Sequence, residues 1–156
     1  MVSITIPSVG TLNLAHLVLD YNGTLAVDGV LLPGVKETLQ SLSRKIDVHV
    51  VTADTFGKAG EGLTGVECQL TVLDPGRQDQ AKLDFVKRLG ADRTVAIGNG
   101  RNDALMLEAA ALGIAVILAE GASTLSLGKA DVVCLNVVEA LQILTHPLRL
   151  RATLRC

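Results

Sequence analysis

The sequence predicts an α/β fold, a three-layer α/β/α sandwich in which a mostly parallel sheet of five to six strands follows an N-terminal β-hairpin. Short aliphatic segments typical of strands alternate with amphipathic segments of helical spacing along most of the 156 residues. Several aliphatic runs are unbroken, as expected for strands that are covered on both faces. The length suits one domain, residues 1–156.

The first half of the chain provides the hairpin, the central strand and two more strands. Residues 3–7 and 11–19 predict the hairpin, and its second strand continues into the sheet. Residues 25–32 are interrupted by Asp28-Gly29 and predict a small loop or flap. Pro33 opens a helix that runs to residue 45. Strands are expected at 46–51 and 66–73, separated by a short helix that its glycines weaken.

The second half continues the alternation of strand and helix. Residues 78–89 form an amphipathic helix with Leu83, Val86 and Leu89 facing inward, and Gly90 ends it. Strands are predicted at 94–97, 114–118 and 132–135, with helices at 103–112 and 123–127 between them. Asn136 caps a last helix to residue 144, and a basic tail follows.

Polar side chains stand where three of these strands end. Asp20 follows Leu17-Val18-Leu19, while Thr52 and Asn99 close or follow two later strands. The carboxyl ends of parallel strands share one edge of the sheet, where ligands of such sheets bind. We therefore expect the three side chains to lie together, and we expect Lys82 of the helix 78–89 to reach the same edge of the sheet. On its own stretch, Asp20 is equally well explained as the start of a turn.

This set of groups suits phosphoryl transfer to a carboxylate. Asp20 can attack phosphorus as a nucleophile, and a divalent cation can bridge it to the phosphate oxygens. Thr52, Lys82 and backbone N–H groups can stabilise the transferring group. Gly23 lets the chain turn sharply and brings its N–H close to an anion. The Thr24 hydroxyl can bond the turn or fix the carboxylate.

Four motifs, in order, resemble those of the haloacid dehalogenase (HAD) superfamily of phosphohydrolases. D-Y-N-G-T resembles the first motif, Thr52 the second, and Lys82 in K-L-D-F-V-K-R-L the third. G-N-G-R-N-D-A-L-M-L resembles the fourth, in the form found in the phosphorylation domain of P-type ATPases. The resemblance spans residues 12–135 and is carried by the set, because Thr52 or Lys82 alone could equally be a surface or capping residue.

The resemblance implies a Rossmann-like domain without a cap domain, and it implies Mg²⁺ as cofactor. It assigns catalytic roles to Asp20, Asn22, Thr52 and Lys82, phosphate binding to Gly23, Thr52, Ala53, Lys82 and Asn102, and metal binding to Asp20, Asn22, Asn99 and Asp103.

Two amides depart from the superfamily pattern. Asn22 stands where most of these phosphatases carry an Asp as general acid and base, and losing that role costs about 10²–10⁴-fold in rate. P-type ATPases also lack this second Asp, so the resemblance to them implies a long-lived aspartyl-phosphate. Asn99 replaces the usual metal-binding Asp, and a neutral oxygen holds Mg²⁺ less tightly. Each Asn precedes a Gly, so backbone shape alone is the alternative explanation.

Two functions therefore remain open. The first is a slow, Mg²⁺-dependent phosphohydrolase that acts through an aspartyl-phosphate on Asp20. The second is a catalytically weak or inactive module that keeps the pocket for phosphate binding or regulation. The expected partner is a small phosphorylated substrate or a phosphoprotein. Because no cap covers the site, either the substrate is large or a neighbouring subunit closes the site, and we expect self-association into a homo-oligomer.

Composition excludes other classes of partner. The net charge is −2 without a basic run, and aromatic residues make up 2%, which argues against nucleic acid. The longest apolar run, residues 114–119, is too short to cross a membrane. Cys68, Cys134 and Cys156 lack the spacing of a zinc site, and free thiols are typical of the cytoplasm. We therefore expect a cytoplasmic protein.

Overall fold

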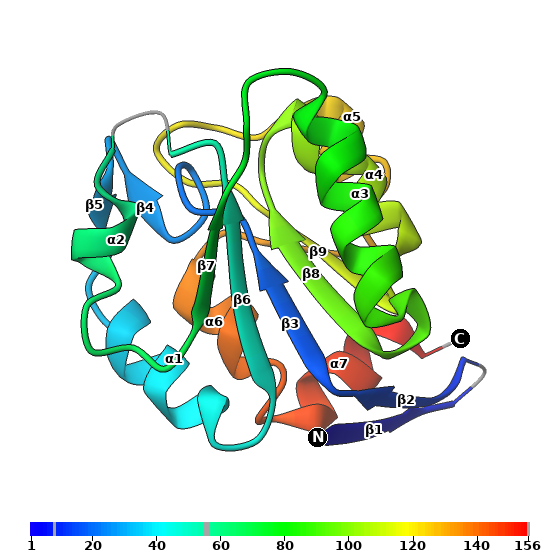
Figure 1. Cartoon of the computed structure of the whole chain (residues 1–156). Coiled ribbons are helices and arrows are strands. Elements are labelled where there is room, and N and C mark those ends of the chain that lie inside the picture. The colour runs from blue at the N-terminus through cyan, green and yellow to red at the C-terminus, as the bar shows by residue number, and fades with distance from the viewer. Residues whose placement is uncertain (8, 55–56, 156) are drawn as a thin grey trace.

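Residues 1–7, 9–54 and 57–155 are described by a computed structural model, so Cys156 lies outside the described residues. Six parallel strands form the central sheet, in the order β10-β9-β8-β3-β6-β7 (Figure 1). These strands are β3 (His16–Leu19), β6 (Asp47–Thr52), β7 (Gln69–Val72), β8 (Thr94–Gly98), β9 (Leu112–Val116) and β10 (Val132–Cys134). The predicted α/β fold with a parallel sheet is confirmed.

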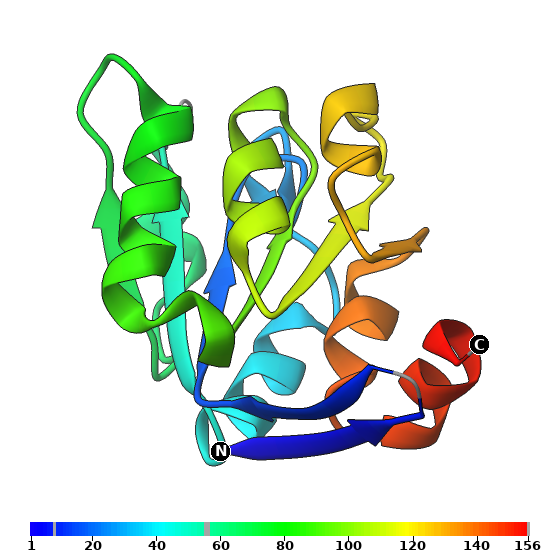
Figure 2. The same cartoon turned by 90° about the vertical axis from the view of Figure 1, so that its right-hand side faces the viewer.

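Helices cover both faces of this sheet (Figures 1 and 2). One face packs against α1 (Val35–Ser43), α2 (Ala59–Gly62) and α6 (Val137–Gln142), and the other against α3 (Gln78–Leu89), α4 (Ala104–Ala109) and α5 (Thr124–Leu127). Successive residues of a strand point to opposite faces. Leu17 and Leu19 therefore join the first core and Val18 the second, all fully buried, which explains the unbroken apolar run before Asp20.

The expected strand over residues 11–19 is in fact two strands in two sheets. β1 (Val2–Ile6) pairs antiparallel with β2 (Gly10–Leu14), and β3 begins after Ala15. Ala15 donates its N–H to the Arg93 carbonyl at 2.8 Å and accepts from the Asp47 N–H at 2.9 Å. The chain thus leaves the hairpin at Ala15 and enters the central sheet between β6 and β8, a change that hydrophobic periodicity does not show.

The predicted flap is a small hairpin of β4 (Ala26–Val27) and β5 (Val30–Leu31). Its two-residue turn has positive φ at Asp28 (51°) and Gly29 (78°), as two-residue hairpin turns require. Within the described ranges, the segments that follow β3 and β6 form only this flap, α1, α2 and β7 before α3 begins. No cap domain is inserted there, as expected.

The remaining elements correct the predicted boundaries. The expected helix 103–112 is a short 3-10 turn, η2 (Arg101–Asp103), followed by α4, because β9 already begins at Leu112. Another 3-10 turn, η1 (Ala91–Arg93), precedes β8. On α3 the buried residues are Lys82, Phe85 and Val86, while Leu83 and Leu89 are only partly buried.

The C-terminal segment, expected as a basic tail, contains a further helix. α7 (Pro147–Leu154) packs against β1 and buries Leu150 completely, so the first strand and the last helix lie side by side (Figure 2). None of the helices in the described ranges combines the length and the hydropathy that crossing a bilayer requires.

Candidate active site

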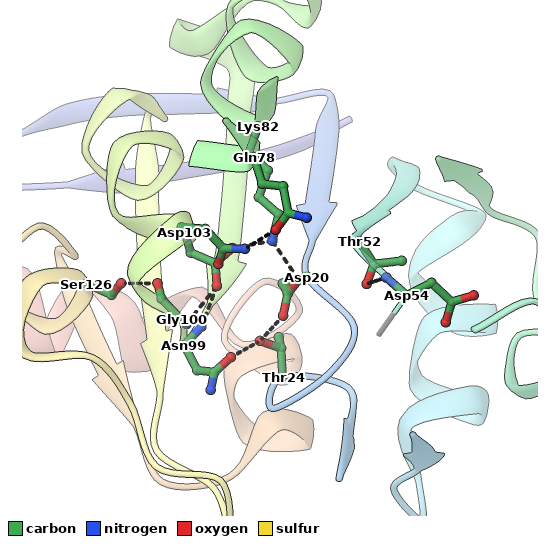
Figure 3. Close-up of polar contacts among 11 residues, drawn as sticks. Asp20, Thr24, Thr52, Asp54, Gln78, Lys82, Asn99, Gly100, Asp103 and Ser126 are labelled. Carbon is green, nitrogen blue, oxygen red and sulfur yellow. Dashed lines mark hydrogen bonds and ion pairs between the residues drawn. The ribbon is translucent and has the colours of Figure 1, made fainter. Parts of the chain in front are cut away.

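Asp20 lies at the carboxyl end of β3, the central strand (Figure 3), and lines a hollow of about 320 Å³. Its N–H donates to the Ile97 carbonyl of β8 at 3.0 Å, which continues the sheet pairing up to the carboxylate. The hollow is lined by Asp20, Asn22, Thr52, Ala53, Gln78, Asn99, Gly100, Asn102 and Glu120. The structure therefore brings the three strand ends of β3, β6 and β8 together, as the sequence predicts.

Lys82 bridges two carboxylates behind this hollow. Its Nζ lies 2.6 Å from Asp20 Oδ1 and 2.7 Å from Asp103 Oδ1, and its side chain is fully buried. Burial by itself lowers the pKa of a lysine, but the charges of Asp103 and Asp20 outweigh burial and raise the pKa of Lys82. Lys82 is therefore a fixed positive charge next to Asp20.

Asp103 anchors the loop that follows β8. Its Oδ2 accepts from the N–H groups of Asn99 at 3.0 Å and Gly100 at 2.8 Å, while Oδ1 accepts from Lys82. A Cβ at Gly98 would come within 2.5 Å of the Asp103 Cγ, so this close approach requires glycine. Asp103 does not line the hollow, and both its oxygens are engaged. Asp103 thus positions Lys82 and the loop, and its role as a metal ligand stays a prediction.

The Asp20 carboxyl is hard to ionise without a bound cation. Burial, the largest cause, and the nearby negative charge of Asp103 raise its pKa from 3.8 to about 7, although Lys82 opposes the change. A cation in the hollow would favour the ionised, nucleophilic form.

The side chains of the hollow suit a hard cation such as Mg²⁺. Asn22 Oδ1 is buried and has no hydrogen-bond partner among the described residues. Asn99 Oδ1 lies 3.2 Å from the Thr24 hydroxyl, which is also 3.4 Å from Asp20 Oδ2, while Asn99 Nδ2 donates to the Gly121 carbonyl at 2.9 Å. Carboxylate and amide oxygens are ligands of Mg²⁺.

Acidic residues alone do not complete such a site. In the described part of the chain, no three His, Cys, Asp or Glu side chains cluster so that they could hold a metal. A cation near Asp20 would therefore depend on amide oxygens of Asn22 and Asn99.

The Gly23 N–H forms a hydrogen bond within its own turn. It donates to the Ala26 carbonyl at 2.7 Å, and phosphate binding by Gly23 stays a prediction. Gly23 has a φ of +77°, and a Cβ there would lie 2.3 Å from Asn99 Nδ2. A glycine is therefore needed at position 23, both for the positive φ of the turn and for the close packing of the Asn99 side chain against it.

Of the other predicted phosphate-binding residues, Thr52, Ala53 and Asn102 line the hollow, whereas Lys82 lies buried behind it. The Thr52 hydroxyl accepts from the Asp54 N–H at 3.0 Å, which orients it and leaves its proton for another acceptor. Asn102 donates through Nδ2 to Gln78 Oε1 at 3.2 Å. Ala53, next to Thr52, completes this side of the hollow.

Two lining side chains were not predicted, Gln78 and Glu120. Gln78 is the first residue of α3, and Glu120 follows β9 and accepts from the Asp28 N–H of the flap at 2.9 Å. The sequence contains a signal for Glu120, because this residue comes shortly after the predicted strand 114–118. Polar residues at the carboxyl ends of parallel strands share one edge of the sheet, and this argument, which selected Asp20, Thr52 and Asn99, applies to that strand as well.

Solved structures share this architecture. The chain superposes on 3-deoxy-D-manno-octulosonate 8-phosphate phosphatase of Moraxella catarrhalis, solved with magnesium, phosphate and the sugar acid, with a TM-score of 0.72, 15% identity and 90% of each chain covered. A Legionella pneumophila protein described as a HAD-superfamily hydrolase of subfamily III A gives a TM-score of 0.72 at 17% identity, over 90% of this chain and 87% of that one. This chain therefore has the same fold as these two proteins.

Relatives in sequence give a second result. The chain is 39% identical over 84 residues to the uncharacterized protein MJ0073 of Methanocaldococcus jannaschii, covering 51% of this chain and 90% of that protein. It belongs to the same family as MJ0073. It is also 35% identical over 89 residues to phosphoserine phosphatase SerB2 of Mycobacterium tuberculosis, over 56% of this chain but 22% of SerB2. No family model matches the chain.

Proposed function

We propose that this protein is a Mg²⁺-dependent phosphohydrolase that forms an aspartyl-phosphate on Asp20. The observation that carries the proposal is the buried Lys82 Nζ, 2.6 Å from a carboxylate that lines an open hollow at the end of the central strand. The similarity to phosphatases of the same fold and to SerB2 supports the same reaction class.

In the first step an oxygen of Asp20 attacks phosphorus, and the bond from phosphorus to the alcohol oxygen of the substrate breaks. In the second step water attacks phosphorus, which releases phosphate and restores the Asp20 carboxylate. Lys82, the Thr52 hydroxyl and the Asn102 amide stabilise the negative charge of the transferring group. Asp20, Asn22 and Asn99 would hold the Mg²⁺, which supplies positive charge to the phosphoryl oxygens.

Proton transfer is the weak point of this site. The Asn22 amide can neither protonate the leaving oxygen nor take a proton from water, so those transfers fall to solvent. The missing general acid and base lowers the rate by about 10²–10⁴-fold. A long-lived aspartyl-phosphate would result, as the resemblance to P-type ATPases implies, because they also lack the second Asp.

A phosphate-binding or regulatory module is the second candidate. It is favoured by one observation, that amides occupy both positions 22 and 99 where the superfamily pattern has carboxylates. In that case the pocket would bind phosphate or a phosphorylated partner without efficient turnover. The hollow has no cap over it, so a phosphoprotein or a neighbouring copy of this chain can reach it, and light scattering at assay concentration tests self-association.

One assay separates the two functions. We expect slow, Mg²⁺-dependent hydrolysis of p-nitrophenyl phosphate by the wild type and none by Asp20→Asn. Asp92→Asn, an exposed residue of η1, is the matched control and keeps full activity. An inactive wild type with an active Asn22→Asp variant would favour the binding module. Full activity in Asp20→Asn would refute the assignment of the nucleophile.

A further inference from the structure

A second hollow of about 490 Å³ adjoins the one that holds Asp20. It is lined by Gly76, Arg77, Gln78, Asp79, Arg101, Asn102, Ala104, Leu105 and Leu125. Gln78 and Asn102 line both hollows, and the hydrogen bond between them, at 3.2 Å, forms part of the ridge that separates the two. The second hollow therefore offers space next to Asp20 for the part of a substrate beyond its phosphate.

The second hollow carries excess positive charge. Arg77 and Arg101 contribute two guanidinium groups, and Asp79 contributes one carboxylate. Arg77 pairs with Asp79 at 3.2 Å, whereas the Arg101 side chain has no hydrogen bond or ion pair among the residues that the structure describes. Arg101 lies on η2, immediately before Asn102, so its backbone adjoins the hollow that holds Asp20.

Apart from these charged groups and the Gln78–Asn102 pair, the second hollow is lined by glycine and apolar side chains. Ala104 and Leu105 belong to the start of α4, and Leu125 of α5 is 42% exposed. A guanidinium group binds carboxylate or phosphate through two parallel hydrogen bonds. The combination suits a carbon chain or ring that ends in an anionic group.

We propose that the second hollow binds a second anionic group of the substrate, through Arg101 and Arg77. This inference rests on the proposed function and narrows its substrate to organic phosphates that carry a carboxylate or another phosphate. The phosphate to be transferred occupies the hollow of Asp20, and the second anion lies beyond the Gln78–Asn102 ridge. Arg101 makes the principal contact because Arg77 must share its charge with Asp79.

Matched pairs of substrates test the inference with Mg²⁺ present. 3-Phosphoglycerate and glycerol 3-phosphate differ by a carboxylate, and fructose 1,6-bisphosphate and fructose 1-phosphate differ by a phosphate. We expect roughly ten-fold higher kcat/KM for the member with the second anion, an advantage that Arg101→Ala removes mainly by raising KM. Arg101→Lys keeps the charge but loses the paired hydrogen bonds, and it should recover only part of the advantage.

Controls separate this inference from the proposed function. Arg44→Ala, an exposed arginine after α1, should leave the preference intact. Calorimetric binding to Asp20→Asn compares the same pairs without turnover, so the test holds even if the wild type is a poor catalyst. A preference in one pair alone supports the inference and identifies the anion as carboxylate or phosphate.

Equal affinity within both pairs, or an Arg101→Ala effect of the same size on both members, would overturn the second-anion site. Hydrolysis of p-nitrophenyl phosphate that depends on Asp20 would then still support the proposed function. Loss of that activity with the binding preference retained would instead overturn hydrolysis and leave the anion site in place.

Discussion

The Asp20→Asn variant should make the metal-free protein more stable at alkaline pH. In the folded protein the pKa of Asp20 is about 7, against 3.8 for an exposed carboxyl, because of burial and the nearby Asp103. The folded state therefore holds a proton that the unfolded chain releases between about pH 4 and pH 7. The stabilisation that comes from the protonated Asp20 is complete when the pH is below the pKa of Asp20 in the unfolded chain. It is lost as the pH rises through the pKa of Asp20 in the folded protein.

The size of this effect follows from the difference between the two pKa values. At 1.36 kcal/mol per pKa unit, the free energy of unfolding falls by about 4 kcal/mol between pH 4 and pH 8. Asparagine has the shape of the protonated carboxyl and no charge, so Asp20→Asn avoids this loss. For a domain of this length, 4 kcal/mol corresponds to a rise in Tm of about 8–16 °C at pH 8.

Urea and thermal unfolding in EDTA, at pH 5 and pH 8, measure this difference. We expect Asp20→Asn to have a higher free energy of unfolding and a higher Tm than the wild type at pH 8. The difference should be smaller at pH 5, and Asp92→Asn should match the wild type at both pH values. Added Mg²⁺ should stabilise the wild type at pH 8 and leave Asp20→Asn unchanged. If Asp20→Asn is no more stable than the wild type at pH 8, the reasoning about the buried carboxyl is wrong.

Two further substitutions test the packing of the site. Lys82→Met leaves two buried carboxylates without their cation, and it should lower the free energy of unfolding by about 3–5 kcal/mol at pH 8. An unchanged midpoint of urea unfolding would contradict the stabilising role of the two ion pairs of Lys82. Gly23→Ala imposes a Cβ 2.3 Å from the Asn99 amide at a φ of +77°, and should cost about 1–3 kcal/mol and weaken Mg²⁺ binding. Wild-type stability and Mg²⁺ affinity in that variant would show that the turn is not required.

The sequence was sufficient to predict which side chains meet at the edge of the sheet. Asp20, Thr52 and Asn99 each come at the end of an aliphatic strand, and a parallel sheet brings such ends together. Lys82 could be placed in the same way, since it lies on the first turns of the helix that leads into β8.

Hydrogen-bond partners were beyond the reach of the sequence. The Gly23 N–H bonds to Ala26, and Asp103 uses both oxygens on Lys82 and the loop, because these choices depend on the folded backbone around them. The change of sheet at Ala15 has the same origin: it depends on contacts with Arg93 and Asp47, which are distant in sequence. Local patterns predict which elements form, but not which polar groups they pair.

Binding of beryllium fluoride, followed by fluorine NMR, tests the role of Asp20 most directly, because this ligand forms a complex with a carboxylate in place of the phosphoryl group. We predict a protein-bound fluorine signal in the wild type that requires Mg²⁺ and disappears in Asp20→Asn, but not in Asp92→Asn. No bound signal in the wild type, or a signal that persists in Asp20→Asn, would contradict the account.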